Sequence, residues 1–107
     1  MMAGRFLQVQ TATPTRDAAE CIAAALVDRR LAACVQVAGP VTSTYRWKGA
    51  VEAAEEFLCL IKTRAALYDK VEAAIRELHP YETPEIIATP IAAGSRDYLQ
   101  WLDRETA

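Results

Sequence analysis

Apolar, β-branched and aromatic residues are concentrated in four stretches of the 107-residue chain, separated by polar residues, and we predict a strand in each stretch. Short runs of this kind, bounded by Gly, Pro or polar residues, are typical of β-strands. Lys48-Gly49 is a turn signal that joins the second and third strands into a long hairpin, whose tip should project beyond the subunit. Pro90 lacks a backbone donor, so the fourth strand should lie at a sheet edge or end there. The predicted strands are residues 6–11, 33–37 resuming as 41–47 after a bend at Gly39-Pro40, 55–63 and 85–91.

Between these strands, apolar residues recur at intervals of three and four, which predicts helices. The first helix begins after Thr13 or Thr15, since either can cap it, and ends with Arg29 and Arg30 in its last turn, where cations favour the helix dipole. The second helix stops before Pro80. The apolar faces are Ala18, Ile22, Ala25 and Leu26 in the first helix, Leu67, Val71, Ala74, Ile75 and Leu78 in the second, and Tyr98, Leu99, Trp101 and Leu102 in a short third helix capped by Ser95.

The predicted order is β-α-β-β-α-β with a short helix at the end, and this order is typical of the ferredoxin-like arrangement. We therefore expect an α+β subunit in which a four-stranded antiparallel sheet carries two helices on one face. A chain of this length fits a single domain, residues 1–107. The strands carry apolar residues toward both faces, most clearly at residues 57–61, so the face without helices should be covered by a partner, most commonly a copy of the same chain.

Composition bears on partners and location. The net charge is −2, without the basic excess that neutralises phosphates, so we expect no nucleic-acid partner. No apolar segment approaches the length of a membrane span, so we expect no membrane partner. Residues 1–10 lack the long apolar run of a secretory leader. The cysteines have no C-x-x-C spacing, and Cys21 and Cys59 are expected to be buried small hydrophobic residues, so the predicted location is the reducing cytoplasm.

His79 is the only histidine and the candidate metal ligand. Imidazole suits copper and zinc, and a carboxylate such as Glu82 or a thiolate such as Cys34 can complete a site. Because one imidazole offers few ligands, we expect the binding of such a divalent metal to be weak. The alternative is that His79 ends a helix and bonds its last carbonyl groups. Cys34 likewise has two interpretations, a ligating or reactive thiolate, or a packed small side chain.

A cleft between subunits is the second candidate site. Lys62, at the end of the third strand, can bind an anion there or simply remain solvated. Tyr81 and Glu82 follow the second helix, and their loop is a candidate rim of the cleft. Trp47 and Trp101 are candidate anchors of the subunit interface. The sequence has no nucleophile–base constellation, phosphate loop or dinucleotide fingerprint, so we predict that the protein is not an enzyme.

Four segments together resemble the CutA family of divalent-cation tolerance proteins, in the order and at the spacing of that family. They are RLAACV at 30–35, YRWKG at 45–49 with EE at 55–56, HPYETPE at 79–85 and DYLQWL at 97–102, so they span nearly the whole chain. The resemblance implies a ferredoxin-like subunit, a tight homotrimer and a link to tolerance of divalent metals such as copper. It also implies an architecture like that of the trimeric PII signalling proteins, although architecture does not fix function.

The resemblance also indicates which positions of this chain correspond to proposed copper ligands in the family. In some relatives the proposed copper ligands are a cysteine at the end of the first strand and two adjacent histidines before Pro-Tyr, at positions that match Thr11, Leu78 and His79 here. Two functions therefore remain open. The first is a homotrimer whose inter-subunit clefts hold a divalent cation or a small ligand, and the second is a PII-like signalling or anchoring trimer that binds another protein.

Overall fold

The computed structural model describes residues 5–107, and its helices and strands follow the predicted order. Residues 1–4, which form part of the segment used to predict the absence of a leader, lie outside the described residues. The described chain consists of β1 (Phe6–Thr13), α1 (Arg16–Asp28), β2 (Cys34–Trp47), β3 (Ala50–Arg64), a 3-10 turn (Ala65–Leu67), α2 (Tyr68–Leu78), β4 (Ile87–Pro90) and α3 (Arg96–Glu105).

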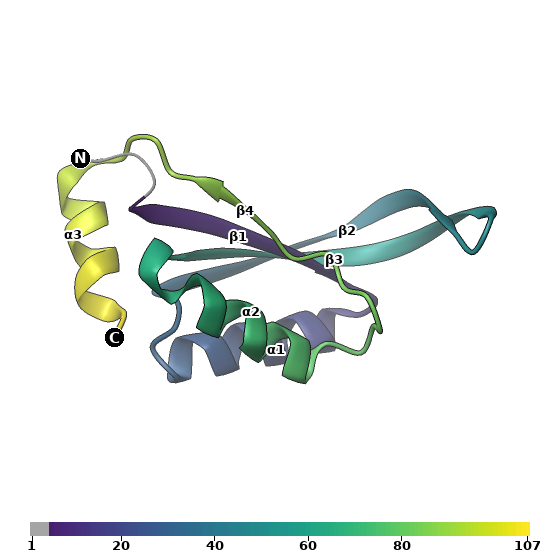
Figure 1. Cartoon of the computed structure of the whole chain (residues 1–107), viewed down its shortest axis with the longest axis horizontal. Coiled ribbons are helices and arrows are strands. Elements are labelled where there is room, and N and C mark those ends of the chain that lie inside the picture. The colour runs from purple at the N-terminus through teal and green to yellow at the C-terminus, as the bar shows by residue number, and fades with distance from the viewer. Residues whose placement is uncertain (1–4) are drawn as a thin grey trace.

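The strands form one antiparallel sheet in the order β2-β3-β1-β4. Helices α1 and α2 lie together on one face of this sheet, and α3 lies at the end opposite the hairpin tip (Figure 1). This is the ferredoxin-like α+β arrangement, which confirms the predicted fold class. The β2-β3 hairpin extends well beyond the helices, and it makes the subunit elongated, with dimensions of 44 × 25 × 22 Å.

The strand limits differ from the prediction because pairing continues into segments without an apolar run. Strand β3 begins at Ala50 rather than Glu55, since residues 50–54 pair with residues 43–47 of β2. Strand β1 likewise continues past residue 11 to Thr13, since both added residues pair with β3. In contrast, β4 is limited to residues 87–90, which are in register with residues 7–10 of β1, and beyond it only the Ile91 N–H donates to β1, to the Phe6 carbonyl at 2.9 Å. It lies at the sheet edge, as Pro90 predicts.

The hairpin contains the predicted bend and turn. The register of β2 and β3 shifts between Ala38 and Val41, on either side of Gly39-Pro40. Gly39 has a φ of 149°, and a Cβ atom at this position would lie 2.9 Å from Cδ2 of Phe57, so a side chain would be both strained and crowded there. At the tip, Lys48 and Gly49 both have positive φ, which is the conformation of a tight hairpin turn.

Helix α1 begins at the second of the two predicted N-caps, and it ends earlier than predicted. Thr15 is the N-cap, and its Oγ1 accepts a hydrogen bond from the Ala18 N–H at 3.1 Å, whereas Thr13 belongs to β1. The helix ends at Asp28, so Arg29 and Arg30 do not lie in its last turn as predicted. The reason is a left-handed residue, Arg30, with a φ of 59°, which cannot continue a right-handed helix.

The main core lies between the sheet and α1 and α2. Cys59 is buried there, as predicted, and its Sγ lies 3.5 Å from the Ala19 carbonyl oxygen. Burial raises the pKa of the Cys59 thiol to about 11. Cys21 was expected in the same core, but it is exposed. The buried face of α1 contains Ala19, Ile22 and Leu26. Cys21 precedes Ile22 in the chain, so its side chain is turned by about 100° away from that face.

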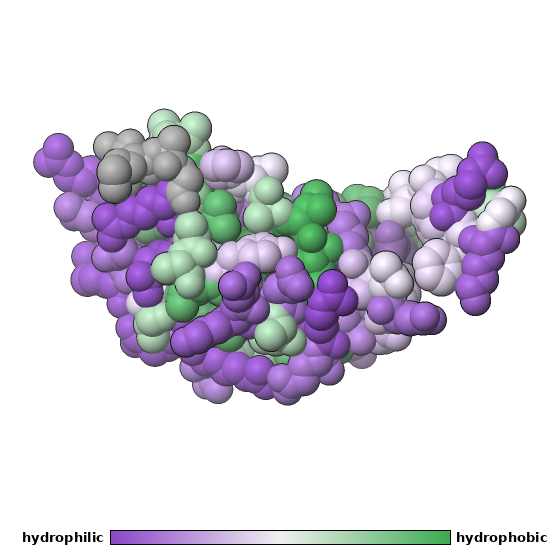
Figure 2. All heavy atoms as spheres, in the orientation of Figure 1, coloured by the Kyte–Doolittle hydropathy of each residue, from purple (hydrophilic) through white to green (hydrophobic). Residues whose placement is uncertain are grey.

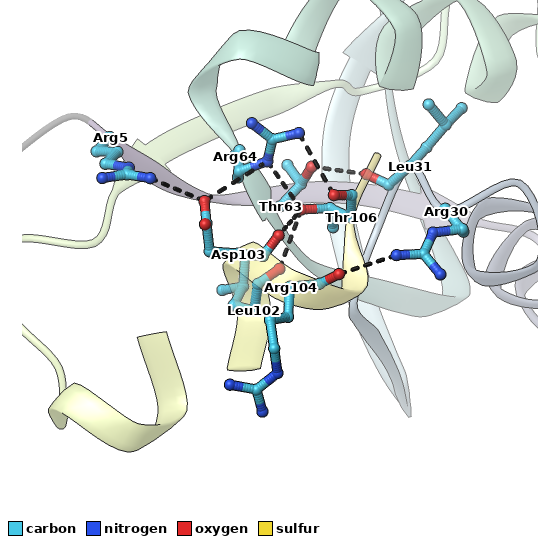
Figure 3. Close-up of polar contacts among 9 residues, drawn as sticks. All are labelled: Arg5, Arg30, Leu31, Thr63, Arg64, Leu102, Asp103, Arg104 and Thr106. Atoms are coloured by element: carbon cyan, nitrogen blue, oxygen red, sulfur yellow. Dashed lines mark hydrogen bonds and ion pairs between the residues drawn. The ribbon is translucent and has the colours of Figure 1, made fainter. Parts of the chain in front are cut away.

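Helix α3 covers one end of the opposite sheet face, where Leu99 and Leu102 bury Phe6. Trp101 packs against the same cluster and lies 5.5 Å from the Tyr98 ring, so this candidate interface residue already has partners within the subunit. Polar contacts fix the C-terminal end of α3 and the residues that follow it (Figure 3). They include Arg64 Nε to Thr106 Oγ1 at 2.9 Å, Arg30 Nη2 to the Arg104 carbonyl at 2.8 Å and the Arg5–Asp103 ion pair at 2.8 Å.

The rest of this face carries no helix in the described chain. The register places Leu58 and Leu60 on it, beside Gln10 and Lys62, so it is mixed rather than uniformly apolar. Ile87 of β4 is 52% exposed. Figure 2 shows apolar surface along the middle of the molecule, over β4 and the segment before it, between hydrophilic areas on the helices and at the hairpin tip. A partly apolar sheet face of this kind is a candidate interface.

Candidate functional site

A groove of about 770 Å³ lies between the projecting part of the β2-β3 hairpin and the segment that follows α2. The hairpin contributes Tyr45, Trp47, Glu52 and Glu56, and residues 81–85 form the other wall. In the antiparallel register Tyr45 pairs with Glu52, and directly opposed residues share a face of the sheet. The groove therefore opens on the face that α1 and α2 leave uncovered, and its volume is in the usual range of small-molecule sites.

Glu56 and Tyr81 connect the two walls. The Tyr81 hydroxyl donates a hydrogen bond to Glu56 Oε2 at 2.9 Å, and Glu56 is only 8% exposed. Burial, with a further contribution from the Glu56 carboxylate, raises the pKa of Tyr81 to about 12. Tyr81 therefore keeps its proton at neutral pH and remains a donor to Glu56. Beside them, Gln10 Nε2 donates to Glu85 Oε2 at 2.8 Å, which fixes the far end of the loop.

His79 supports this loop from beneath. It is 8% exposed, its Nε2 lies 2.8 Å from the Ala12 carbonyl oxygen, and its Nδ1 accepts a hydrogen bond from the Tyr81 N–H at 3.1 Å. Because the carbonyl can only accept and the amide can only donate, Nε2 carries the proton and the ring is neutral. Both ring nitrogens thus have protein partners, and the Tyr81 ring lies 4.9 Å from the imidazole.

The structure separates the predicted site residues into two groups. Tyr81 and Glu82 line the groove, whereas Cys34 and Lys62 pair with each other where β2 begins, on the same face of the sheet. Lys62 Nζ donates to Gln36 Oε1 at 2.6 Å, and Cys34 is half-buried. Cys34 pairs with Lys62, which lies six positions along β3 from Glu56, and this corresponds to roughly 20 Å. Within one subunit, Cys34 therefore does not complete a site with the groove residues.

Sequence reasoning missed Glu52, Glu56 and Tyr45 as groove residues. Glu55 and Glu56 are adjacent on β3 and point to opposite faces of the sheet, so these two carboxylates do not form a pair in one pocket. Glu52 and Glu56 are four residues apart on the same strand, so they share a face with each other. The signal that could have found them was the pairing of β3 with β2 across the turn at Lys48-Gly49, which brings Tyr45 opposite Glu52.

The described residues do not form a ready-made metal centre. Within residues 5–107, no three side chains of His, Cys, Asp or Glu are close enough together to hold a metal ion. In the same part of the chain, no helix has the length and apolar character needed to cross a membrane.

Residues 7–105 match the family model of the CutA1 divalent ion tolerance protein. The chain belongs to the CutA1 family. The divalent-cation tolerance protein CutA of Thermus thermophilus is 47% identical over 93 residues, which cover 87% of this chain and 90% of that protein. The human protein CutA is 43% identical over 93 residues, but these make up only 52% of its length. The curated vertebrate and plant CutA relatives are thus longer than the part that this chain matches.

Solved CutA1 structures have the same fold as this chain. The Thermus thermophilus protein superposes with a TM-score of 0.93 at 44% identity, covering 95% of this chain and 99% of that one. CutA from Xylella fastidiosa gives a TM-score of 0.94 at 37% identity, covering 96% and 99%. The names of CutA relatives describe divalent-cation tolerance and specify no reaction. They also include a chloroplast protein of Arabidopsis thaliana and a periplasmic protein of Archaeoglobus fulgidus, so CutA1 proteins are not confined to one compartment.

Proposed function

We propose that the chain acts as a homotrimer in tolerance of divalent cations and that the groove is its ligand-binding cleft, bordered by a neighbouring subunit. The observation that carries this proposal is the buried carboxylate of Glu56 in a groove that opens on the uncovered sheet face. A cleft on that face comes to lie beside a second copy once the face is covered. Equilibrium dialysis of the native protein against small-molecule and cation pools, with Glu56→Gln as the comparison, tests whether the groove binds a ligand.

Two features support the trimer. Strand β2 is a 14-residue edge of the sheet, and an edge of this length with unpaired backbone groups is normally covered or paired. Trp47 near the hairpin tip is 42% exposed, which suits an anchor that packs into a neighbouring subunit. Three hairpins around a threefold axis satisfy both features in a closed assembly.

The trimer is tested by mass and by one substitution. Light scattering after gel filtration should give three times the subunit mass of 11.8 kDa. Trp47→Ala should weaken association by about 2 kcal/mol per interface, because exposed aromatic anchors dominate interface energies. Trp101→Phe is the comparison, since Trp101 packs within its own subunit. A monomeric mass at micromolar concentration contradicts both the trimer and a shared cleft.

We also propose that copper or zinc binds only weakly and that His79 takes part, with Glu82 or another carboxylate of the loop. Both ring nitrogens of His79 are hydrogen-bonded within the protein, so a metal must first displace the Ala12 carbonyl or the Tyr81 amide. This cost is the reason for the low affinity. Copper and zinc titrations of the wild type and His79→Ala test the proposal, which fails if the two proteins bind equally or neither binds.

The second candidate function is a PII-like signalling or anchoring trimer without a metal role. It is favoured by the exposed apolar side chains of the hairpin, where Val51 is 64% exposed, because such side chains on a projecting element suit contact with another protein. Cys34 and Lys62 lie far from that tip and remain candidates for a separate cleft between subunits. In either case we propose a cytoplasmic, non-catalytic protein. Cross-linking from a cysteine placed at Val51 in cells distinguishes a foreign partner from self-contact.

A further inference from the structure

Glu56 is a buried carboxylate without a cationic partner in its own chain. Among residues 5–107, its hydrogen-bond donor is the uncharged hydroxyl of Tyr81, and none of their ion pairs includes Glu56. Removing a carboxylate from water is costly, and buried charges are therefore normally paired. Glu56 Oε1 has no hydrogen-bond partner among these residues and is not fully shielded from solvent, so this oxygen is open to a cation that reaches it through the groove.

The remaining lining of the groove suits an organic cation. Three aromatic rings, from Tyr45, Trp47 and Tyr81, border it, and no Lys, Arg or His is among its lining residues. Aromatic faces attract ammonium groups while also packing against aliphatic carbon. One such contact already exists at this site, since Lys48 Nζ lies 5.8 Å from the centre of the Trp47 ring.

The spacing of the carboxylates favours an elongated ligand over a point charge. Glu52, Glu82 and Glu85 line the groove together with Glu56, yet no three carboxylates within residues 5–107 are close enough to enclose a metal ion. A chain that carries more than one positive charge can contact them in turn. Tyr81 already occupies Glu56 Oε2, which interferes with the two parallel hydrogen bonds of a guanidinium and leaves Oε1 for a single donor, as an ammonium provides.

We propose that this groove binds a primary ammonium group carried on an aliphatic chain, with Glu56 as the partner of the charge and the aromatic rings beside the chain. Linear diamines and polyamines have this chemistry, and so does a lysine side chain of a peptide. The inference rests on the proposed function, because it names the ligand class of the proposed cleft.

The test uses the full chain with Trp101→Phe, so that Trp47 is the fluorescent reporter in the groove. Spermidine, a short diamine and Nα-acetyl-lysine amide are titrated at constant ionic strength, with sodium and magnesium chloride as reference cations. We expect a saturable change in Trp47 emission with the amines and none with the reference salts. Binding by the diamine and spermidine identifies a free amine as the ligand, whereas binding by the lysine compound alone identifies a protein side chain.

Two variants locate the site, and one serves as the control. Glu56→Gln keeps the side-chain shape and removes the charge, so amine affinity should fall roughly tenfold or more. Glu52→Gln, on the exposed rim, should weaken binding roughly twofold without a risk to folding. Glu20→Gln removes the same charge from the exposed surface of α1 and should leave affinity unchanged. Circular dichroism confirms that each variant is folded.

Two results would overturn the inference. One is the absence of a saturable response to every amine, and the other is equal weakening by Glu56→Gln and Glu20→Gln, which indicates general attraction to an acidic protein. Light scattering on the same samples distinguishes failure of the proposed ligand class from failure of the proposed function. A trimer that binds no amine contradicts only the ligand class, whereas a monomer contradicts the shared cleft itself.

Discussion

Replacement of His79 by alanine should destabilise the protein even in the complete absence of metal. The substitution leaves the Ala12 carbonyl and the Tyr81 N–H without their partners at 2.8 and 3.1 Å. Each unsatisfied group costs about 1–3 kcal/mol when it is buried. Ala12 is buried, whereas Tyr81 lies at the surface, where water can replace part of the loss. We therefore expect the free energy of unfolding to fall by about 3 kcal/mol per subunit.

Urea unfolding in excess chelator measures this loss, at one fixed protein concentration because an oligomer unfolds in a concentration-dependent way. His79→Gln is the matched variant, since its amide can still donate to the Ala12 carbonyl, and it should recover about 1 kcal/mol. A metal-free loss below about 0.5 kcal/mol, the size expected for a surface substitution, would refute this structural role for the imidazole. A difference between the proteins that emerges only with added copper or zinc would assign His79 to metal binding instead.

Two further substitutions test the groove and the core. Tyr81→Phe should remove a tyrosine titration near pH 12 from the ultraviolet spectrum, because the pKa of Tyr81 is raised from 10.0 to about 12. The folded state holds the Tyr81 proton more tightly, so the stability that this proton contributes is complete below pH 10 and is lost between pH 10 and 12. The wild type should therefore lose more stability than Tyr81→Phe over that interval. Equal losses in the two proteins would contradict the Tyr81–Glu56 contact. Leu99→Ala should lower the free energy of unfolding by about 3 kcal/mol, because it opens a cavity against Phe6. Denaturant unfolding measures it, and a loss below about 1 kcal/mol would mean that α3 is not firmly docked.

The sequence was sufficient for the type and order of the helices and strands, because their apolar periods are distinct. The bend at Gly39-Pro40 and the edge position of β4 were also predictable, since glycine and proline have specific backbone requirements. The full length of β3 was not, because residues 50–54 are held by pairing with β2 and not by an apolar pattern of their own. The exposure of Cys21 depends on where the buried face of α1 lies, and several small alanines left that face poorly defined.

The candidate site was less predictable than the fold. Tyr81 and Glu82 were identified because they follow a helix stop, but Glu56 gains its importance only from a contact across 25 positions of the chain. The role of His79 beneath the loop likewise depends on the Ala12 carbonyl, 67 positions away. Contacts of this kind depend on how the segment after α2 lies against β1 and β3. A list of residue types and spacings does not contain them.

The left-handed turn at Arg30 has a consequence for the order in which the protein folds. A non-glycine residue in this conformation costs about 1 kcal/mol, and here its side chain bonds the Arg104 carbonyl while its own carbonyl accepts from the Ala107 N–H. The contact between Arg30 and Arg104 spans 74 positions of the chain and the contact with Ala107 is longer still, so both form only after the slow closure of a long loop. The Leu31 and Ala32 N–H groups donate locally to the Leu26 carbonyl and can be protected as soon as α1 forms, whereas the Ala107 N–H, which donates to the Arg30 carbonyl, should gain protection from hydrogen exchange only when α3 docks.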